Sequence, residues 1–198
     1  MAKLDTYPSF AATSRRKWRD WLLANHDTSP GIWLVNYRPG SGQPRLRYDE
    51  AVEEALCFGW IDSQARTIDD ERAKQLYTPR RRGSGWSRLN KQRIDRLLTA
   101  GLMHPAGVAK METAQRDGSW TIYDAIEDLA MPDDLVAALA AHPTAGAGFL
   151  AFSASTRKQL LWWIASAKRP ETRSNRIERV AAGAVAGKTP IAYQRKRS

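Results

Sequence analysis

The stretch between residues 48 and 90 decides the fold, and its two densest segments are LCFGWIDSQ (Leu56–Gln64) and LYTPRRRGSGWSRLN (Leu76–Asn90). Before Gly59 the apolar residues recur at the spacing of a helix, and after it they alternate as they do in a strand. The stretch therefore predicts a helix, a glycine stop, two strands, a cationic turn and a second helix, in that order.

The first helix of this stretch is predicted to begin after Asp49, whose side chain suits an N-cap, and to end before Gly59. From Trp60 onward the alternation predicts a strand, in which side chains two positions apart point to the same side. We therefore expect Trp60, Asp62 and Gln64 to share one face of that strand.

The fold class follows from the order of these elements. A short acidic turn joins the last two predicted strands, which favours a hairpin. Residues 1–12 are predicted to form a loose lead-in, and the chain is predicted to be helical after Gly101. We expect an α+β fold with a small antiparallel sheet and helices, followed by an all-helical C-terminal half. The predicted strands are Ile32–Arg38, Trp60–Ile68 and Ala73–Thr78.

Composition and charge suggest how the chain is divided. Its formal net charge is +10 over 198 residues, and four of the cations lie after residue 187 with no acid among them. We expect an α+β N-terminal part over residues 1–118, a helical part over 132–187 and a basic, flexible tail over 188–198. Too few apolar residues lie in that tail to offset the entropy lost on ordering.

The arginine run Arg80–Arg82, followed by a glycine turn and a helix capped by Ser87, has two interpretations. Guanidinium groups beside free backbone N–H groups can form an anion site, in which Asp62 could orient one arginine. Short charge runs are also common on solvated surface turns. The same two readings apply to Arg173, Arg176 and Arg179 on a C-terminal helix, and this row could converge with the first on one anion.

The candidate ligand-binding residues are the cationic, polar and aromatic side chains of these segments. They are Trp60, Asp62, Gln64, Arg80, Arg81, Trp86, Asn90, Arg173 and Arg176.

Metal, redox and membrane chemistry find little support in the sequence. The single cysteine, Cys57, permits no disulfide within the chain, which favours a cytoplasmic location. The three histidines form no ligand pattern, so neither a metal nor a cofactor is expected. No uncharged apolar run reaches the length of a membrane span.

Several short pieces of this sequence occur together in one known family. They are Trp18 with Trp21-Leu22, Gly59-Trp60-Ile61-Asp62-Ser63, Thr78-Pro79-Arg80, Trp86-Ser87 with Asn90, Gly101-Leu102-Met103 before Pro105, and Ala167-Lys168-Arg169-Pro170-Glu171-Thr172-Arg173 with Arg176. In this combination the chain resembles the YdeI/OmpD-associated family (OmdA), also called the bacteriocin-protection family.

That resemblance implies an N-terminal part similar to the YjbR/CyaY group and a helical C-terminal part. It also implies a role in resistance to antimicrobial peptides or bacteriocins, in concert with a porin. It supplies no catalytic residues.

Three classes of function stay open. The first is a non-catalytic binding module for an anionic small molecule or an acidic protein partner. The second is weak, non-specific binding of nucleic acid, which the net charge favours although no sequence-reading motif is present. The third is an enzyme that uses Asp62, although no nucleophile–base pair can be recognised.

Overall fold

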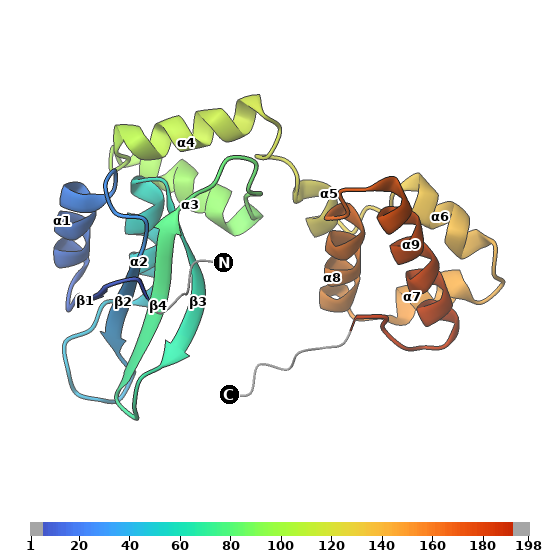
Figure 1. Ribbon diagram of the computed structural model, residues 1–198, viewed down its shortest axis with the longest axis horizontal. Helices are drawn as coiled ribbons and strands as arrows, with labels where there is room; N and C mark the ends of the chain where they lie inside the picture. Colours follow the sequence, from blue (N-terminus) through green and yellow to red (C-terminus); the bar gives the residue numbers. More distant parts are fainter. Residues whose placement is uncertain (1–5, 192–198) are drawn as a thin grey trace. The chain divides into compact units, whose positions relative to one another are not determined.

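The computed structural model describes residues 6–191, and the chain divides into two compact units, Met1–Thr121 and Ile122–Ser198 (Figure 1). The first unit is α+β and the second is all-helical, so the predicted fold class is confirmed. Each unit has its own buried core.

The first unit is built on a four-stranded sheet in the order β1-β2-β4-β3. Its strands are β1 (Ser9–Ala11), β2 (Ile32–Tyr37), β3 (Trp60–Thr67) and β4 (Arg72–Pro79). Its helices are α1 (Arg15–Asn25), α2 (Tyr48–Cys57), α3 (Arg88–Thr99) and α4 (Pro105–Arg116).

The sheet is mixed rather than purely antiparallel, which corrects the sequence prediction. The three strands that were predicted pair antiparallel, but β1 lies parallel to β2, with Ser9 opposite Trp33. β1 falls within the supposed loose lead-in. It has only three residues, too few for alternation to reveal a strand, and its pairing depends on the tertiary fold.

A β-bulge in β3 changes the face of the sheet to which the side chains after Asp62 point. Asp62 lies opposite Tyr77 and Ala65 lies opposite Gln75, so β3 holds one more residue than β4 between these two pairs. The alternation is therefore broken, and Ala65 rather than Gln64 continues the face of Asp62. The expectation that Gln64 shares that face is wrong.

The start of α2 also differs from the prediction, since Arg47 and not Asp49 occupies the N-cap position. The Arg47 backbone N–H donates to the Glu50 carboxylate at 3.0 Å, while Asp49 lies in the first turn and pairs with the Arg47 guanidinium at 2.7 Å. Both carboxylates suit the positive end of the helix. Gly59 follows the helix at φ 74°, as predicted.

Helices α1 and α2 are joined by a buried carboxylate, in addition to their apolar contacts. Glu54 is 2% exposed, and it accepts from Arg15 Nε at 2.5 Å and from Arg19 Nη1 at 2.7 Å. Most of the other buried residues of this unit are apolar, and several are aromatic. Its largest buried members include Trp18, Leu22, Leu56, Trp60, Tyr77, Trp86 and Ile94.

The second unit consists of short helices around one apolar core. They are α5 (Asp124–Glu127), α6 (Asp133–Ala140), α7 (Ala145–Ala151), α8 (Ala154–Ala165) and α9 (Pro170–Val185). No helix in the part of the chain that the structure describes is long and apolar enough to cross a membrane.

The predicted basic tail is only partly covered by the structure, because residues 192–198 lie outside the described residues. Its first residues lie against the end of α9. The Lys188 backbone N–H donates to the Gly183 carbonyl at 2.9 Å, and Arg179 Nη2 donates to the Pro190 carbonyl at 3.0 Å. Ile191 is partly buried against the core of the second unit.

Candidate anion-binding site

The arginine turn, defined here as residues 80–86, connects β4 to α3. The Arg80 backbone N–H donates to the Gly59 carbonyl at 2.9 Å, so the turn begins hydrogen-bonded to the chain that enters β3. The Arg81 carbonyl then accepts from the Ser84 N–H and hydroxyl at 3.2 and 2.7 Å. Gly83 has φ 74°, a conformation that glycine adopts without strain.

A cavity of about 200 Å³ lies between this turn and the C-terminal part of α4. Its polar and charged lining comes from both sides. These residues are Arg80, Arg81, Arg82, Ser84, Lys110, Thr113, Asp117 and Ser119. Among the lining residues, four are cations and one is a carboxylate, so the field inside the cavity favours an anion.

Arg80 is held rigidly at the floor of the turn. Its guanidinium carbon lies 3.6 Å from the centroid of the Trp86 ring, and its Nη2 donates to the Gly85 carbonyl at 3.1 Å. Arg80 is 5% exposed and Trp86 is 2% exposed. Trp86 is itself fixed by the Trp120 ring, with centroids 5.1 Å apart. Stacking on an aromatic face suits a planar guanidinium and orients its N–H groups.

The one carboxylate of the cavity is already engaged. Asp117 Oδ1 accepts from the Ser119 hydroxyl at 2.6 Å and from the Ser119 backbone N–H at 3.0 Å. These hydrogen bonds, with a smaller effect from Arg82, lower the pKa of Asp117 below its ordinary value. Asp117 Oδ2 also lies 3.6 Å from Arg82 Nε. Arg82 is therefore partly neutralised, while Arg81 and Lys110 remain as cations of the lining.

Two family models match the chain. Residues 10–110, just over half of its length, match a family described as a domain of unknown function (DUF8412). The chain belongs to the DUF8412 family. Residues 128–187 match a second model, described as Bacteriocin-protection, YdeI or OmpD-Associated (OmdA), which confirms the resemblance for that part of the chain. The similarity to the YdeI/OmpD-associated family thus covers residues 128–187, under a third of the chain. No curated protein and no solved structure matches it.

The predicted site residues within the DUF8412 match do not all meet at the arginine turn. Arg80, Arg81 and Trp86 line its cavity. Trp60 is a core anchor at 1% exposure, and its indole N–H donates to the His26 carbonyl at 3.1 Å. Gln64 is exposed on the bulge of β3.

Asp62 and Asn90 are both hydrogen-bonded to other side chains of the first unit. The Asp62 carboxylate accepts from the Tyr48 hydroxyl at 2.7 Å and from Gln75 Nε2 at 3.4 Å. The Asn90 side-chain oxygen accepts from Arg93 Nη1 at 2.9 Å. Arg80 stacks on Trp86 and donates to the Gly85 carbonyl, and both contacts contribute to its orientation. That Asp62 orients one arginine of the turn stays a prediction.

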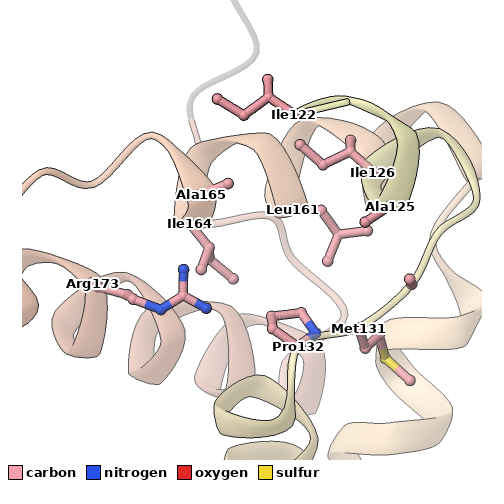
Figure 2. A pocket seen from close by; sticks show the side chains of 10 residues that line it. Ile122, Ala125, Ile126, Met131, Pro132, Leu161, Ile164, Ala165 and Arg173 are labelled. Carbon is pink, nitrogen blue, oxygen red and sulfur yellow. The ribbon is translucent and has the colours of Figure 1, made fainter. Parts of the chain in front are cut away.

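The predicted residues within the OmdA match have separate surroundings. Arg173 forms two hydrogen bonds with Asp134, at 2.6 and 2.9 Å, which lower the pKa of that carboxyl. Figure 2 shows the Arg173 side chain at an otherwise largely apolar cavity of about 220 Å³. The apolar side chains around it include Ile122, Ile126, Met131, Pro132, Leu161 and Ile164.

Arg176, one turn further along α9, lies against a different surface. Its guanidinium is 5.2 Å from the Trp163 ring centroid, and its Nη1 donates to the Trp163 carbonyl and to the Ser166 hydroxyl. Arg179 lies over the same ring at 5.1 Å. The expected convergence of this row with the arginine turn joins residues of two units and stays a prediction.

The sequence did not predict the residues that α4 contributes to the lining of this cavity. Lys110, Ala114 and Asp117 stand at i, i+4 and i+7, which places them on one face of a helix, and Thr113 lies beside them. That spacing was visible in the sequence. Its proximity to the arginine turn was not, because it depends on how α4 packs.

Proposed function

We propose that the protein is a non-catalytic binding module that holds a small anion, or one anionic group of a partner, in the cavity of the arginine turn. The observation that carries this proposal is the charge of the lining, with four cations around one already engaged carboxylate. Charge-assisted hydrogen bonds from guanidinium groups are the strong contacts by which proteins hold phosphate and carboxylate.

The size of the cavity favours a single anionic group. Its volume of about 200 Å³ is below the roughly 300–1,000 Å³ that is typical of sites for whole small molecules. A phosphate, a sulfate or the carboxylate of a larger partner suits such a space. Because Arg80 is already immobilised on Trp86, little further side-chain entropy is lost there on binding.

The OmdA family description links its members to bacteriocin protection or to OmpD. We propose that any such role of this chain involves an anionic partner. A chain with net charge +10 attracts anions and repels cationic peptides at long range.

Titration of the full chain with inorganic phosphate at low ionic strength tests the proposal. Arg81→Gln and Lys110→Gln should each weaken phosphate binding about tenfold, since each removes a charge-assisted contact. Asp117→Asn should strengthen binding, because it removes the opposing charge and keeps an oxygen that can accept from Ser119. Arg116→Gln is the matched control, since Arg116 lies on α4 without lining the cavity.

Two outcomes would count against the proposal. The first is phosphate affinity that is the same in Arg81→Gln, Lys110→Gln and the Arg116→Gln control. The second is weaker binding by Asp117→Asn. Binding of DNA that is unchanged in all of these variants and lost with rising salt would favour the non-specific nucleic-acid alternative instead.

A further inference from the structure

The second unit contains a cavity of about 220 Å³ whose lining is apolar except for one arginine (Figure 2). We call it the Arg173 cavity. Its lining comes from the segment around α5, the loop that leads to α6, the end of α8 and the first turn of α9. All of these residues belong to the second unit, and none lines the cavity of the arginine turn.

The apolar lining includes both buried and exposed side chains. Leu161 and Ile164 of α8 are 3% and 1% exposed, whereas Ile122 and Met131 are 48% and 37% exposed. Large apolar side chains that stay exposed beside a cavity favour an apolar ligand, since contact with it removes them from water. The greater part of any occupant should therefore be apolar.

Arg173 is the one charged residue of this lining, and Asp134 holds it in place. Arg173 Nε and Nη2 donate to the two Asp134 oxygens at 2.6 and 2.9 Å, so one edge of the guanidinium is engaged. Its Nη1 donates to no group within residues 6–191. The Arg173 side chain is 32% exposed, and Figure 2 shows its guanidinium extending from α9 toward Ile164 and Pro132. Arg173 therefore offers N–H groups to the cavity from a fixed position.

Asp134 balances the charge of Arg173 but does not itself line the cavity. A guanidinium has five N–H donors, so an arginine that pairs with one carboxylate through one edge can bind a second carboxylate through another. The apolar residues nearby lower the local dielectric, which strengthens such hydrogen bonds. The lining thus combines an apolar surface with a single, preorganised contact for an anionic group.

We propose that the Arg173 cavity binds a small monocarboxylic acid with an apolar chain of about six carbons. The carboxylate pairs with the open edge of Arg173, and the chain lies against the apolar lining. The volume sets the size of the acid. About 220 Å³ corresponds to roughly seven or eight non-hydrogen atoms, at the ~30 Å³ that one water molecule occupies in the liquid. An anion with several polar groups, such as a nucleotide, would place some of them against apolar side chains without partners.

Titration of the full chain with hexanoate, followed by NMR of the isoleucine methyl groups, tests the inference. Hexanoate should bind with a Kd of about 1 mM or tighter, as expected for a ligand of this size. It should shift the methyl signals of Ile122, Ile126 and Ile164, which line the cavity, and leave that of Ile94 in the core of the first unit unchanged. Hexanol has the same chain without the charge and should bind about tenfold more weakly.

Two variants and a series of acids separate the contribution of Arg173 from that of the apolar lining. Arg173→Gln should remove the preference for hexanoate and leave hexanol binding unchanged, because the apolar lining is intact. Arg176→Gln is the matched control, since Arg176 lies one turn further along α9 without lining the cavity, and it should change neither affinity. Among straight-chain acids, the affinity should rise about fourfold per added methylene up to hexanoate and then level off.

Three results would overturn the inference. Cavity methyl signals that do not move with hexanoate at about 10 mM, tenfold above the expected Kd, exclude this ligand class. A preference for hexanoate over hexanol that is absent in the wild type, or that survives in Arg173→Gln, shows that Arg173 does not bind the carboxylate. Affinity that keeps rising with chain length as far as decanoate indicates an open apolar surface in place of a cavity of this size. None of these results involves Arg81 or Lys110, so they leave the proposed anion site untouched.

Discussion

Two glycines of α7 should respond in opposite ways to the same substitution. A Cβ built at Gly148 would lie 2.0 Å from the carbonyl oxygen of Ala184 in α9. A Cβ at Gly146, two positions earlier and on roughly the opposite side of the helix, would meet no atom within 4 Å. Gly148 therefore lets α7 and α9 approach closely, while Gly146 contributes only flexibility.

The destabilisation expected for Gly148→Ala follows from the backbone movement that the substitution requires. Because Cβ contacts shorter than 3.0 Å are essentially never seen, Gly148→Ala requires the two backbones to separate by about 1 Å. Both contacting groups belong to helices, so neither can turn aside as a flexible side chain would. Overpacking of this kind costs about 1–3 kcal/mol and occasionally more. We expect a net loss near the upper end, about 3 kcal/mol, after the better helix propensity of alanine is included.

Gly146→Ala is the matched control within the same helix. It replaces glycine at an open helical position, and should stabilise the unit by about 0.5–1 kcal/mol. Six of the eight tryptophans lie in the first unit, so total fluorescence would not isolate the second. Hydrogen exchange of the α9 amides, measured by mass spectrometry on the full chain, reports the opening free energy of that unit alone. Equal exchange rates in the two variants would refute this account of the contact.

Two further predictions concern the first unit. Glu54→Gln should lower its free energy of unfolding by about 2–3 kcal/mol, less than for a fully buried pair because Arg15 and Arg19 are each about a third exposed. Denaturation followed by tryptophan fluorescence checks this prediction. A decrease in the free energy of unfolding of less than about 0.5 kcal/mol, which is what an exposed ion pair contributes, would contradict it. His104 Nδ1 accepts from the Ala106 N–H at 3.2 Å, and burial, with nearby cations, lowers the pKa of His104 below 6.5. The contribution of the His104 cap to the free energy of unfolding should therefore be fully present above pH 6.5 and should be lost as the pH falls through the lowered pKa. His104→Asn should remove this pH dependence, because asparagine keeps the cap and does not titrate.

The elements that the sequence predicts well are those whose signal is local. β2 and β4 alternate over six to eight residues, and both were placed to within about one residue at each end. β1 is a three-residue strand whose existence depends on its neighbour, so alternation cannot reveal it. The bulge in β3 occurs at Ser63 and Gln64, without a glycine or proline to mark it, and it moved Gln64 off the expected face.

The candidate site was predictable to a similar extent. Proximity in sequence was enough to place Arg80, Arg81 and Trp86 around one turn. Long-range pairings were not readable in the same way. Tyr48 lies on the first turn of α2, where its hydroxyl reaches Asp62 fourteen positions later. Such a contact is fixed by how α2 lies on the sheet, which no spacing in the sequence expresses.

The three arginines of the run differ in burial, and this difference helps to distinguish an anion site from a solvated turn. A solvated turn would leave all three guanidinium groups in water, yet Arg80 is 5% exposed beneath the turn while Arg81 and Arg82 are exposed. Burying a cation is costly unless its surroundings compensate, and here the Trp86 ring and the Gly85 carbonyl do so. Arg80 thus acts as the fixed base of the turn. It orients the segment that carries Arg81, and a lysine in its place could not stack in the same way.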